Sequence, residues 1–349
     1  MRRILLLIFA LSVAATARSQ GTIDDPREDE IVRGPDVLLR GTAPPATNVV
    51  LRVNGTVLTV PVAGSVWTAV VPLVAGLNVI DATLGSQSKS FAVTRAANVS
   101  SRQNPQRVRL HWKQGVDGAL QQIASDTMTK QRMPNGAIVS RSLTAREQQE
   151  FVDRVKPRVA ELFAEAFQSA GSIMLTMETD HDVHVVTFTS ENLNQYGEQL
   201  PDCGNRISGE ESKVSVGYLH HRLTFQFSDW KPMELTDELD VRIEDVARSL
   251  ARTAAHETGH ALGLVLERGD CGWMHGCDDF HTCQLFQLSN PAVNRFGSGR
   301  FIMDPAGATR VNMRLGESTD SIRGNSRTSP VFSNFDRSYL RFIQPKAGN

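Results

Sequence analysis

The sequence predicts an α+β protein of two domains, a small all-β domain followed by a larger domain that mixes a sheet with helices. Three observations lead to this prediction. A chain of 349 residues is too long for one small core and suits two. Short β-rich runs recur over residues 22–97, and helical periodicity appears only after residue 107. Between them, residues 100–106 are polar and contain one proline, as linkers often do.

The first nineteen residues predict an export signal. Arg2 and Arg3 precede an apolar run over residues 4–15, and Ala15-Thr16-Ala17 supplies small residues for cleavage. The run is too short to span a bilayer comfortably, and an uncleaved anchor is the alternative. We therefore expect cleavage near residues 17–19 and a mature protein that is secreted or periplasmic, without a membrane span.

The charge composition limits the classes of binding partner that we expect. Lys and Arg total 37 and Asp and Glu total 38, so the formal net charge is −1. Without a basic excess, nucleic acid and anionic membranes are disfavoured. Hydrophobic residues at 40% and charged residues at 21% are ordinary for a folded protein.

The β-rich region contains a hairpin signal. Residues 49–53 and 56–60 are two β-rich runs separated only by Asn54-Gly55. Both residues of this pair tolerate positive φ, which a two-residue hairpin turn requires. Further short runs lie at 37–41, 67–71, 78–83 and 89–94, and their regular spacing indicates a sandwich.

The stretch over residues 38–84, from LLRGTAPPATNVVLRVNGTVLTV through GSVWTAVVPLVAGLNVIDATL, resembles the bacterial immunoglobulin-like repeats of secreted proteins. The resemblance implies an immunoglobulin-like β-sandwich over residues 22–97. It leaves two roles open: a spacer, which we favour, and an adhesion or substrate-targeting module.

The second domain begins with an amphipathic helical pattern interrupted by Pro157, so the helix either kinks or begins there. Strands are expected at 173–175, 183–188 and 223–227, and loops over 189–217. The helical pattern is formed by Phe151, Val155, Val159, Leu162, Phe163 and Phe167.

A second helix, capped by Thr236 or Asp237 and running to about Leu262, bears the candidate chemistry. Its core face is predicted to consist of Leu239, Ile243, Val246, Leu250 and Ala254.

His256 and His260 lie four residues apart, about one turn, so both imidazoles can reach one ion. Zinc suits such a pair because imidazole nitrogen is a good ligand for it. Glu257 follows the first histidine, where its carboxylate can take a proton from a water that the metal activates. Gly263 can end the helix by a sharp turn.

The motif His256-Glu257-Thr258-Gly259-His260-Ala261-Leu262-Gly263, with Ile302-Met303-Asp304 downstream, resembles the metzincin clan of zinc peptidases. The resemblance implies a zincin-like catalytic domain over residues 107–349, with a mixed sheet and an active-site helix. It implies that Glu257 is the general base and that Met303 is the structural methionine below the metal. Residues 332–345 would form the helix after that turn.

The third zinc ligand departs from the metzincin pattern. The usual position holds Leu266, which cannot bind zinc. Four later residues are candidates, and we favour His281, then His275; the carboxylates and an inactive site stay open. The remaining candidates are Glu267 and Asp270.

The four cysteines suggest two disulfides in an exported protein, with three pairings open. Three of them lie in one thirteen-residue stretch, 271–283, that follows the histidine motif, so we expect at least one bridge to brace the loop that contains His275 and His281. A cysteine-ligated second zinc site is the less favoured alternative because no Cys-x-x-Cys pair is present. The cysteines are Cys203, Cys271, Cys277 and Cys283.

Other polar clusters are weaker candidates. His220-His221 and the pair His181 and His184 could form a second metal site, but surface histidines are the favoured interpretation. Asp278-Asp279 is either a calcium ligand pair or, as we prefer, part of a solvated loop.

Together these features predict a secreted zinc-dependent endopeptidase acting on a protein or peptide substrate. A non-catalytic zinc-binding adhesion protein with a relic peptidase fold is the alternative, motivated by Leu266. A zinc hydrolase acting on a non-peptide bond also fits the motif.

Overall fold

The computed structural model confirms the predicted α+β class, because it contains helices together with several sheets. The chain divides into two compact units. The first comprises residues 1–28, 36–73 and 79–91, and the second comprises 29–35, 74–78 and 92–349. The structure describes residues 21–27, 30–45, 47–95, 105–126, 128–168, 173–199, 209–223, 239–264, 302, 332 and 334–343.

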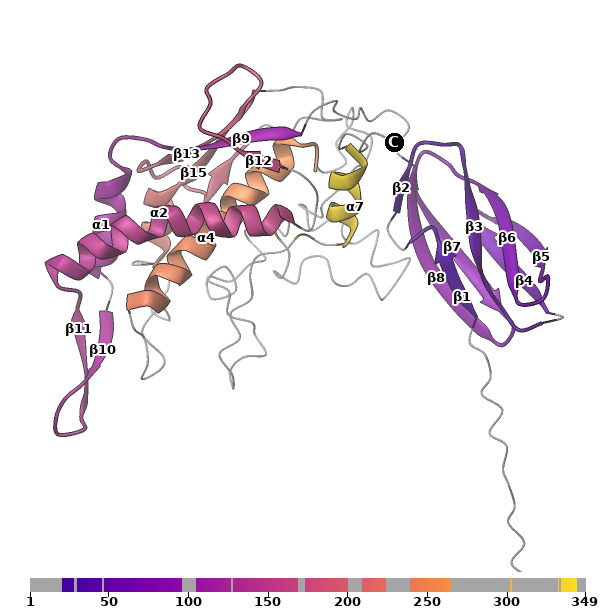
Figure 1. Ribbon diagram of the computed structural model, residues 1–349, viewed down its shortest axis with the longest axis horizontal. Helices are drawn as coiled ribbons and strands as arrows, with labels where there is room; N and C mark the ends of the chain where they lie inside the picture. Colours follow the sequence, from indigo (N-terminus) through magenta and orange to yellow (C-terminus); the bar gives the residue numbers. More distant parts are fainter. Residues whose placement is uncertain are drawn as a thin grey trace, which may run out of the picture. The chain divides into compact units, whose positions relative to one another are not determined.

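The strands before residue 96 form two sheets (Figure 1), a three-stranded one in the order β1-β3-β6 and a five-stranded one in the order β2-β8-β7-β4-β5. Their bounds are β1 Thr22–Asp25, β2 Glu30–Val32, β3 Asp36–Thr42, β4 Asn48–Val53, β5 Thr56–Pro61, β6 Val66–Pro72, β7 Gly76–Leu84 and β8 Gln87–Arg95.

The β4–β5 hairpin is the predicted one. Val53 pairs with Thr56 across the turn, and both turn residues have positive φ, 49° for Asn54 and 81° for Gly55. In β3 the side chains alternate between exposed and buried, as in a strand with one face on a core. Trp67 is 1% exposed, and its indole N–H donates to the Thr42 carbonyl at 3.2 Å.

A second five-stranded sheet, in the order β12-β9-β13-β15-β14, supports the candidate site. Its strands run parallel except β14, which is antiparallel to β15 and stands at the end of the strand order. The bounds are β9 Gln106–Trp112, β12 Ile173–Leu175, β13 His184–Thr189, β14 Gly197–Glu198 and β15 Glu211–Ser215. A separate hairpin joins β10 Met128–Arg132 to β11 Ile138–Ser142.

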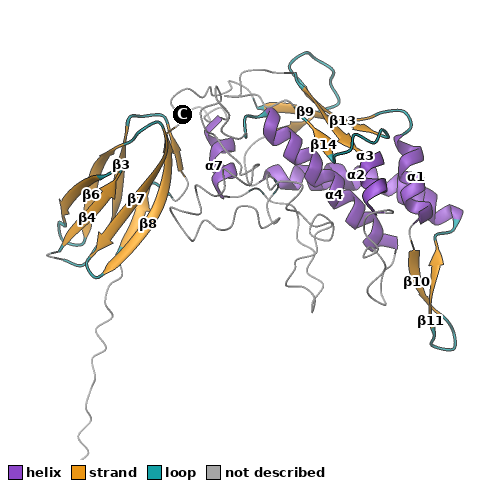
Figure 2. Cartoon of the chain, turned by 180° about the vertical axis from the view of Figure 1, so that it is seen from behind, coloured by secondary structure: helices purple, strands orange, loops and turns teal. Residues whose placement is uncertain are grey.

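Helices α2 (Ala145–Gln168) and α4 (Leu239–Ala261) contact each other on one face of this sheet (Figure 2). Their apolar sides share a core with Val108, Val186 and Val214 from its strands. The helices of this unit are α1 Val116–Asp126, α2 Ala145–Gln168, α3 Val216–His221, α4 Leu239–Ala261 and α7 Asn334–Ile343. The five residues predicted to form the core face of α4 all contribute to this core, with Leu239 only partly buried.

Helix α2 begins twelve residues before Pro157, which lies inside it. Its start is a capping box: the Glu147 amide donates to the Thr144 hydroxyl, and the Thr144 amide donates to the Glu147 carboxylate at 2.8 Å. The Arg141 guanidinium and this amide lower the pKa of Glu147 to about 2. This cap explains why the helix starts at residue 145 rather than at the proline.

Two predictions about strands were wrong. The region 189–217, expected to be loops, contains β14 and β15, and β15 lies inside the sheet. Its sequence, Glu211–Ser215, is mostly polar, so its single buried valine gave no apolar pattern. The strand expected at 223–227 begins with Leu223, which belongs to a helical turn after α3; residues 224–227 lie outside the described residues.

The helix expected near the C-terminus is present as α7, with Leu340 and Ile343 buried. Among the helices that the structure describes, none is long and apolar enough to cross a membrane. The predicted signal segment and most of the predicted linker, residues 100–104, lie outside the described residues.

Candidate active site

Helix α4 brings His256 and His260 together as predicted. Their Nε2 atoms are 3.2 Å apart, and the two rings meet edge to face, with centroids 4.7 Å apart and an interplanar angle of 90°. Both residues lie in the last two turns of α4. One helical turn therefore suffices to aim both imidazoles at a single point.

Backbone carbonyls determine which nitrogen of each ring carries the proton. His256 Nδ1 lies 2.7 Å from the Ile302 carbonyl oxygen, and His260 Nδ1 lies 2.8 Å from the Leu264 carbonyl oxygen. A carbonyl oxygen only accepts, so each Nδ1 donates, and in the neutral rings each Nε2 presents a lone pair. Two lone pairs directed at each other across 3.2 Å repel unless a cation lies between them.

This arrangement fits a zinc ion. Two imidazole nitrogens, each about 2.0–2.1 Å from a tetrahedral zinc, lie about 3.3–3.4 Å apart. The observed 3.2 Å between the two Nε2 atoms is close to that separation. The carbonyl partners on Nδ1 are the outer contacts that orient metal-binding histidines.

Burial keeps His260 in the neutral form that a metal requires. Loss of solvation lowers the pKa of His260 to about 4, and the hydrogen bond to the Leu264 carbonyl opposes that shift. Near neutral pH the imidazole is therefore uncharged, and its Nε2 lone pair is available.

Glu257, the predicted base, is 6% exposed and faces the edge of the sheet. Its carboxylate lies beside Gly197 of β14: a Cβ built on Gly197 would be 2.3 Å from Glu257 Oε1. Strand β14 thus approaches the residue between the two histidines. No pattern in the sequence marked Gly197, because it lies in a region expected to be a loop.

Gly263 ends α4 as predicted. Its φ is 92°, its amide donates to the His260 carbonyl at 3.0 Å, and the Leu264 amide donates to the Gly259 carbonyl at 2.9 Å. These two bonds form a Schellman motif, in which the residue at positive φ is usually glycine. The motif turns the chain so that the Leu264 carbonyl returns to His260 Nδ1.

We expect Gly263→Ala to destabilise the protein by about 1–2 kcal/mol, because a side chain disfavours positive φ. It should also weaken zinc binding by about 10–100-fold, because it disturbs the carbonyl that orients His260. Denaturant unfolding and zinc titration measure the two effects.

Gly55→Ala is the matched control for that prediction, since Gly55 has a φ of 81° and open space around it on the β4–β5 turn. It should show a similar backbone penalty with unchanged zinc affinity. Equal loss of zinc affinity in both variants would contradict the orienting role of the turn.

The remaining predicted site residues fall outside the part of the chain that the structure describes. In the part of the chain that the structure describes, no group of three or more His, Cys, Asp or Glu side chains is arranged to hold a metal. The following lie outside the described residues: Leu266, Glu267, Asp270, His275, Asp278, Asp279, His281, Met303 and the four cysteines. Ile302 is described, is 1% exposed, and immediately precedes Met303.

The other histidines have their own contacts. His220 Nε2 lies 2.7 Å from Asp126 Oδ2 of α1, and the His221 ring lies against Tyr218. His184 is buried and its Nε2 lies 2.9 Å from the Ser212 hydroxyl, whereas His181 is exposed. Among the described residues, none of these histidines belongs to a group of three or more possible metal ligands. The buried His184 corrects the expectation that these histidines lie on the surface.

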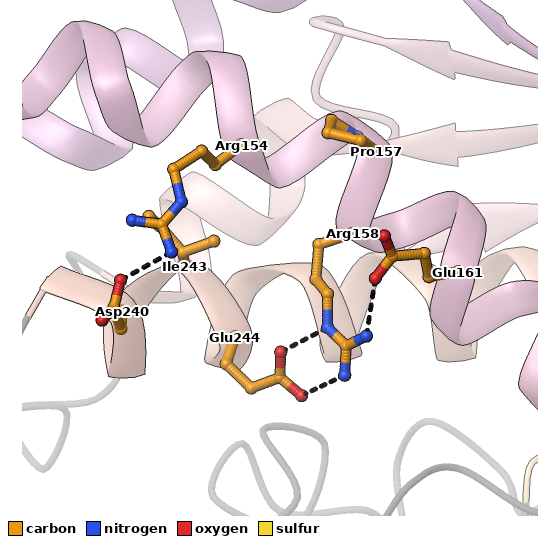
Figure 3. Close-up of a pocket in the computed structure, with 7 residues that line it drawn as sticks. All are labelled: Arg154, Pro157, Arg158, Glu161, Asp240, Ile243 and Glu244. Carbon is orange, nitrogen blue, oxygen red and sulfur yellow. Dashed lines mark hydrogen bonds and ion pairs between the residues drawn. The ribbon is translucent and has the colours of Figure 1, made fainter.

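A cleft of about 550 Å³ lies between α2 and α4 (Figure 3). Its α4 residues belong to the first turns of that helix, whereas the histidines belong to the last turns. The charged side chains of the cleft are paired: Arg158 forms a two-pronged ion pair with Glu244, at 2.6 and 3.0 Å. Arg154 Nη2 pairs with Asp240 at 2.6 Å. Glu244 and His256 are separated by about 18 Å of helix. The cleft therefore presents paired charges rather than reactive groups, and it is separate from the histidine site.

Comparison with known proteins identifies no family for this chain. No family model and no curated protein matches it. Among solved structures it is similar to an FMN-binding β-glucuronidase from Faecalibacterium prausnitzii, with 21% identity and a TM-score of 0.19, over 22% of this chain and 12% of that one. It is also similar to a carbohydrate acetylesterase from Xanthomonas citri, with 11% identity and a TM-score of 0.18, over 82% of this chain and 70% of that one. Such low TM-scores carry no argument about fold or activity.

Proposed function

We propose that this protein is a secreted zinc-dependent endopeptidase with a metzincin-like catalytic domain. One observation carries the proposal: carbonyl acceptors on both Nδ1 atoms leave the Nε2 lone pairs of His256 and His260 converging at 3.2 Å. Only a cation at that point makes the arrangement favourable. The lowered pKa of His260, about 4, favours a metal ion over a proton there.

The chain's own residues divide the work of hydrolysis. When bound, zinc supplies a Lewis acid that polarises the scissile carbonyl and lowers the pKa of water. His256 and His260 would hold it through Nε2, and the carbonyls of Ile302 and Leu264 orient the two rings. Glu257 takes a proton from the attacking water and returns it to the amine as the C–N bond breaks. The products are a carboxylic acid and an amine, so the reaction consumes one water.

The edge of the sheet supports a peptide as the substrate. Strand β14 is at the end of the strand order, and Gly197 in it lies beside Glu257. An extended peptide can pair with the backbone of such an edge strand, which would bring a peptide bond close to the base. This supports an endopeptidase over a zinc hydrolase acting on a different bond.

The third ligand and the methionine turn belong to the same proposal. The contact between the Ile302 carbonyl and His256 supports a turn at Met303 next to the site, because Met303 is the following residue. We assign the third position to His281 in the cysteine-rich loop, with His275 as the alternative. Disulfides among the four cysteines would hold that loop.

The remaining parts of the chain complete the proposal. Residues 1–19 would direct export, and residues 22–97 would form an immunoglobulin-like sandwich that serves as a spacer. The catalytic domain would span residues 107–349. The two sheets before residue 96 and the buried Trp67 are consistent with a sandwich.

A second candidate is a non-catalytic zinc-binding adhesion protein with a relic peptidase fold. Leu266, at the usual position of the third ligand, favours it. It differs from the endopeptidase in two measurable respects, the affinity for zinc and the hydrolysis of casein.

Metal removal tests the two candidates. We expect the purified protein to contain one tight zinc per chain and to hydrolyse casein, to lose both after dialysis against EDTA, and to regain activity when zinc is added. Less than one tight equivalent, together with no hydrolysis of casein, would favour the relic. Full activity after complete removal of metal would contradict zinc catalysis.

A further inference from the structure

We propose that Gly197 is a positioning residue for Glu257: its missing side chain provides the space that the Glu257 carboxylate occupies. The inference rests on the proposed function, in which Glu257 is the base. It adds a residue from the sheet to a site that the sequence motif places on one helix.

The contact is close along the whole end of the glutamate side chain. A Cβ built on Gly197 would lie 2.3 Å from Glu257 Oε1 and 2.7 Å from both its Cδ and its Cγ. Each of these distances is far shorter than the 3.5–4.0 Å of an ordinary contact between carbon atoms. A residue with any side chain at position 197 therefore displaces Glu257 from its place.

The backbone does not require a glycine at this position. Gly197 is absent from the set of glycines with positive φ, and it lies in a strand whose conformation any residue adopts. It pairs with Val214 of β15 through the main chain, which is independent of the side chain. What glycine contributes here is the lack of a Cβ.

The atoms that must move in Gly197→Ala belong to a flexible side chain and not to the helix backbone. Helix α4, His256 and His260 can therefore keep their places while the carboxylate shifts. A misplacement of about 1 Å can reduce a catalytic rate by about 100-fold. We expect Gly197→Ala to fold, to hold one zinc, and to show a kcat on casein-derived peptide about 100-fold lower at a nearly unchanged KM.

A double-mutant cycle on the full-length protein tests the contact without any measurement of activity. The midpoint of thermal unfolding, Tm, is measured for the parent, Gly197→Ala, Glu257→Ala and the double variant. We expect Gly197→Ala to lower Tm when Glu257 is present and to leave Tm unchanged or raise it in the Glu257→Ala background. Equal changes in the two backgrounds would overturn the proposal, because the new methyl group would then not act on Glu257.

Gly118→Ala is the matched control for activity. Gly118 is exposed on α1 and a Cβ there meets nothing within 4 Å, so we expect full activity and unchanged zinc content. Parent-like kcat in Gly197→Ala would also overturn the positioning role. A parent that holds no zinc and hydrolyses no peptide would refute the proposed function, whereas equal Tm changes in the cycle would refute the role of Gly197 alone.

Discussion

Glu257→Ala should leave a folded protein that holds zinc and hydrolyses casein about 10²–10⁴-fold more slowly than the parent. The substitution removes the carboxylate that the proposal assigns to proton transfer, while His256 and His260 keep their carbonyl partners. Zinc content, circular dichroism and the rate of casein hydrolysis are measured on the same preparation.

The control for this prediction is Glu191→Ala, since Glu191 is an exposed glutamate that follows strand β13. It should match the parent in all three measurements. If Glu257→Ala cleaves casein as fast as the parent, the proposed mechanism is wrong. If it loses zinc as well as activity, Glu257 has a role in holding the metal that the proposal does not include.

The second large effect is expected at the two histidines that we propose as metal ligands. His256→Ala and His260→Ala should each reduce zinc to less than one tight equivalent per chain and abolish hydrolysis of casein. Each substitution removes one of two converging donors, and a neutral alanine cannot replace it. Zinc is measured by elemental analysis after gel filtration, and activity is measured on casein.

The same assay identifies the third ligand. We expect His281→Ala to behave like His260→Ala, and His275→Ala to retain zinc. The reverse pattern would place His275 at the metal. His111, exposed on β9, is the control, and His111→Ala should keep zinc and activity. If the parent itself holds less than one equivalent and neither loop histidine changes that value, the relic becomes the better explanation.

Local patterns in the sequence predicted much of the fold. The Asn54-Gly55 turn, the amphipathic helix around Phe163 and the helix that ends at Gly263 were all recognised, because each depends on residues a few positions apart. Strand β15 was missed because its sequence is polar; it pairs with β13, whose residues lie more than twenty positions earlier. Pairing between distant segments leaves no local signal in such a strand.

In the candidate site too, some features follow from local sequence and others only from contacts between distant segments. The sequence by itself determined the two histidines, the glutamate between them and the glycine that ends the helix, because one turn of α-helix dictates their spacing. Only the tertiary structure decided that the carbonyls of Ile302 and Leu264 accept from Nδ1 of the two imidazoles, so that Nδ1 carries the proton in each ring. It also decided that Gly197 leaves room for Glu257. Backbone oxygens and absent side chains have no signature in a sequence. They act on the site only after the fold has brought a sheet edge, a helix end and a distant loop to within a few ångströms of each other.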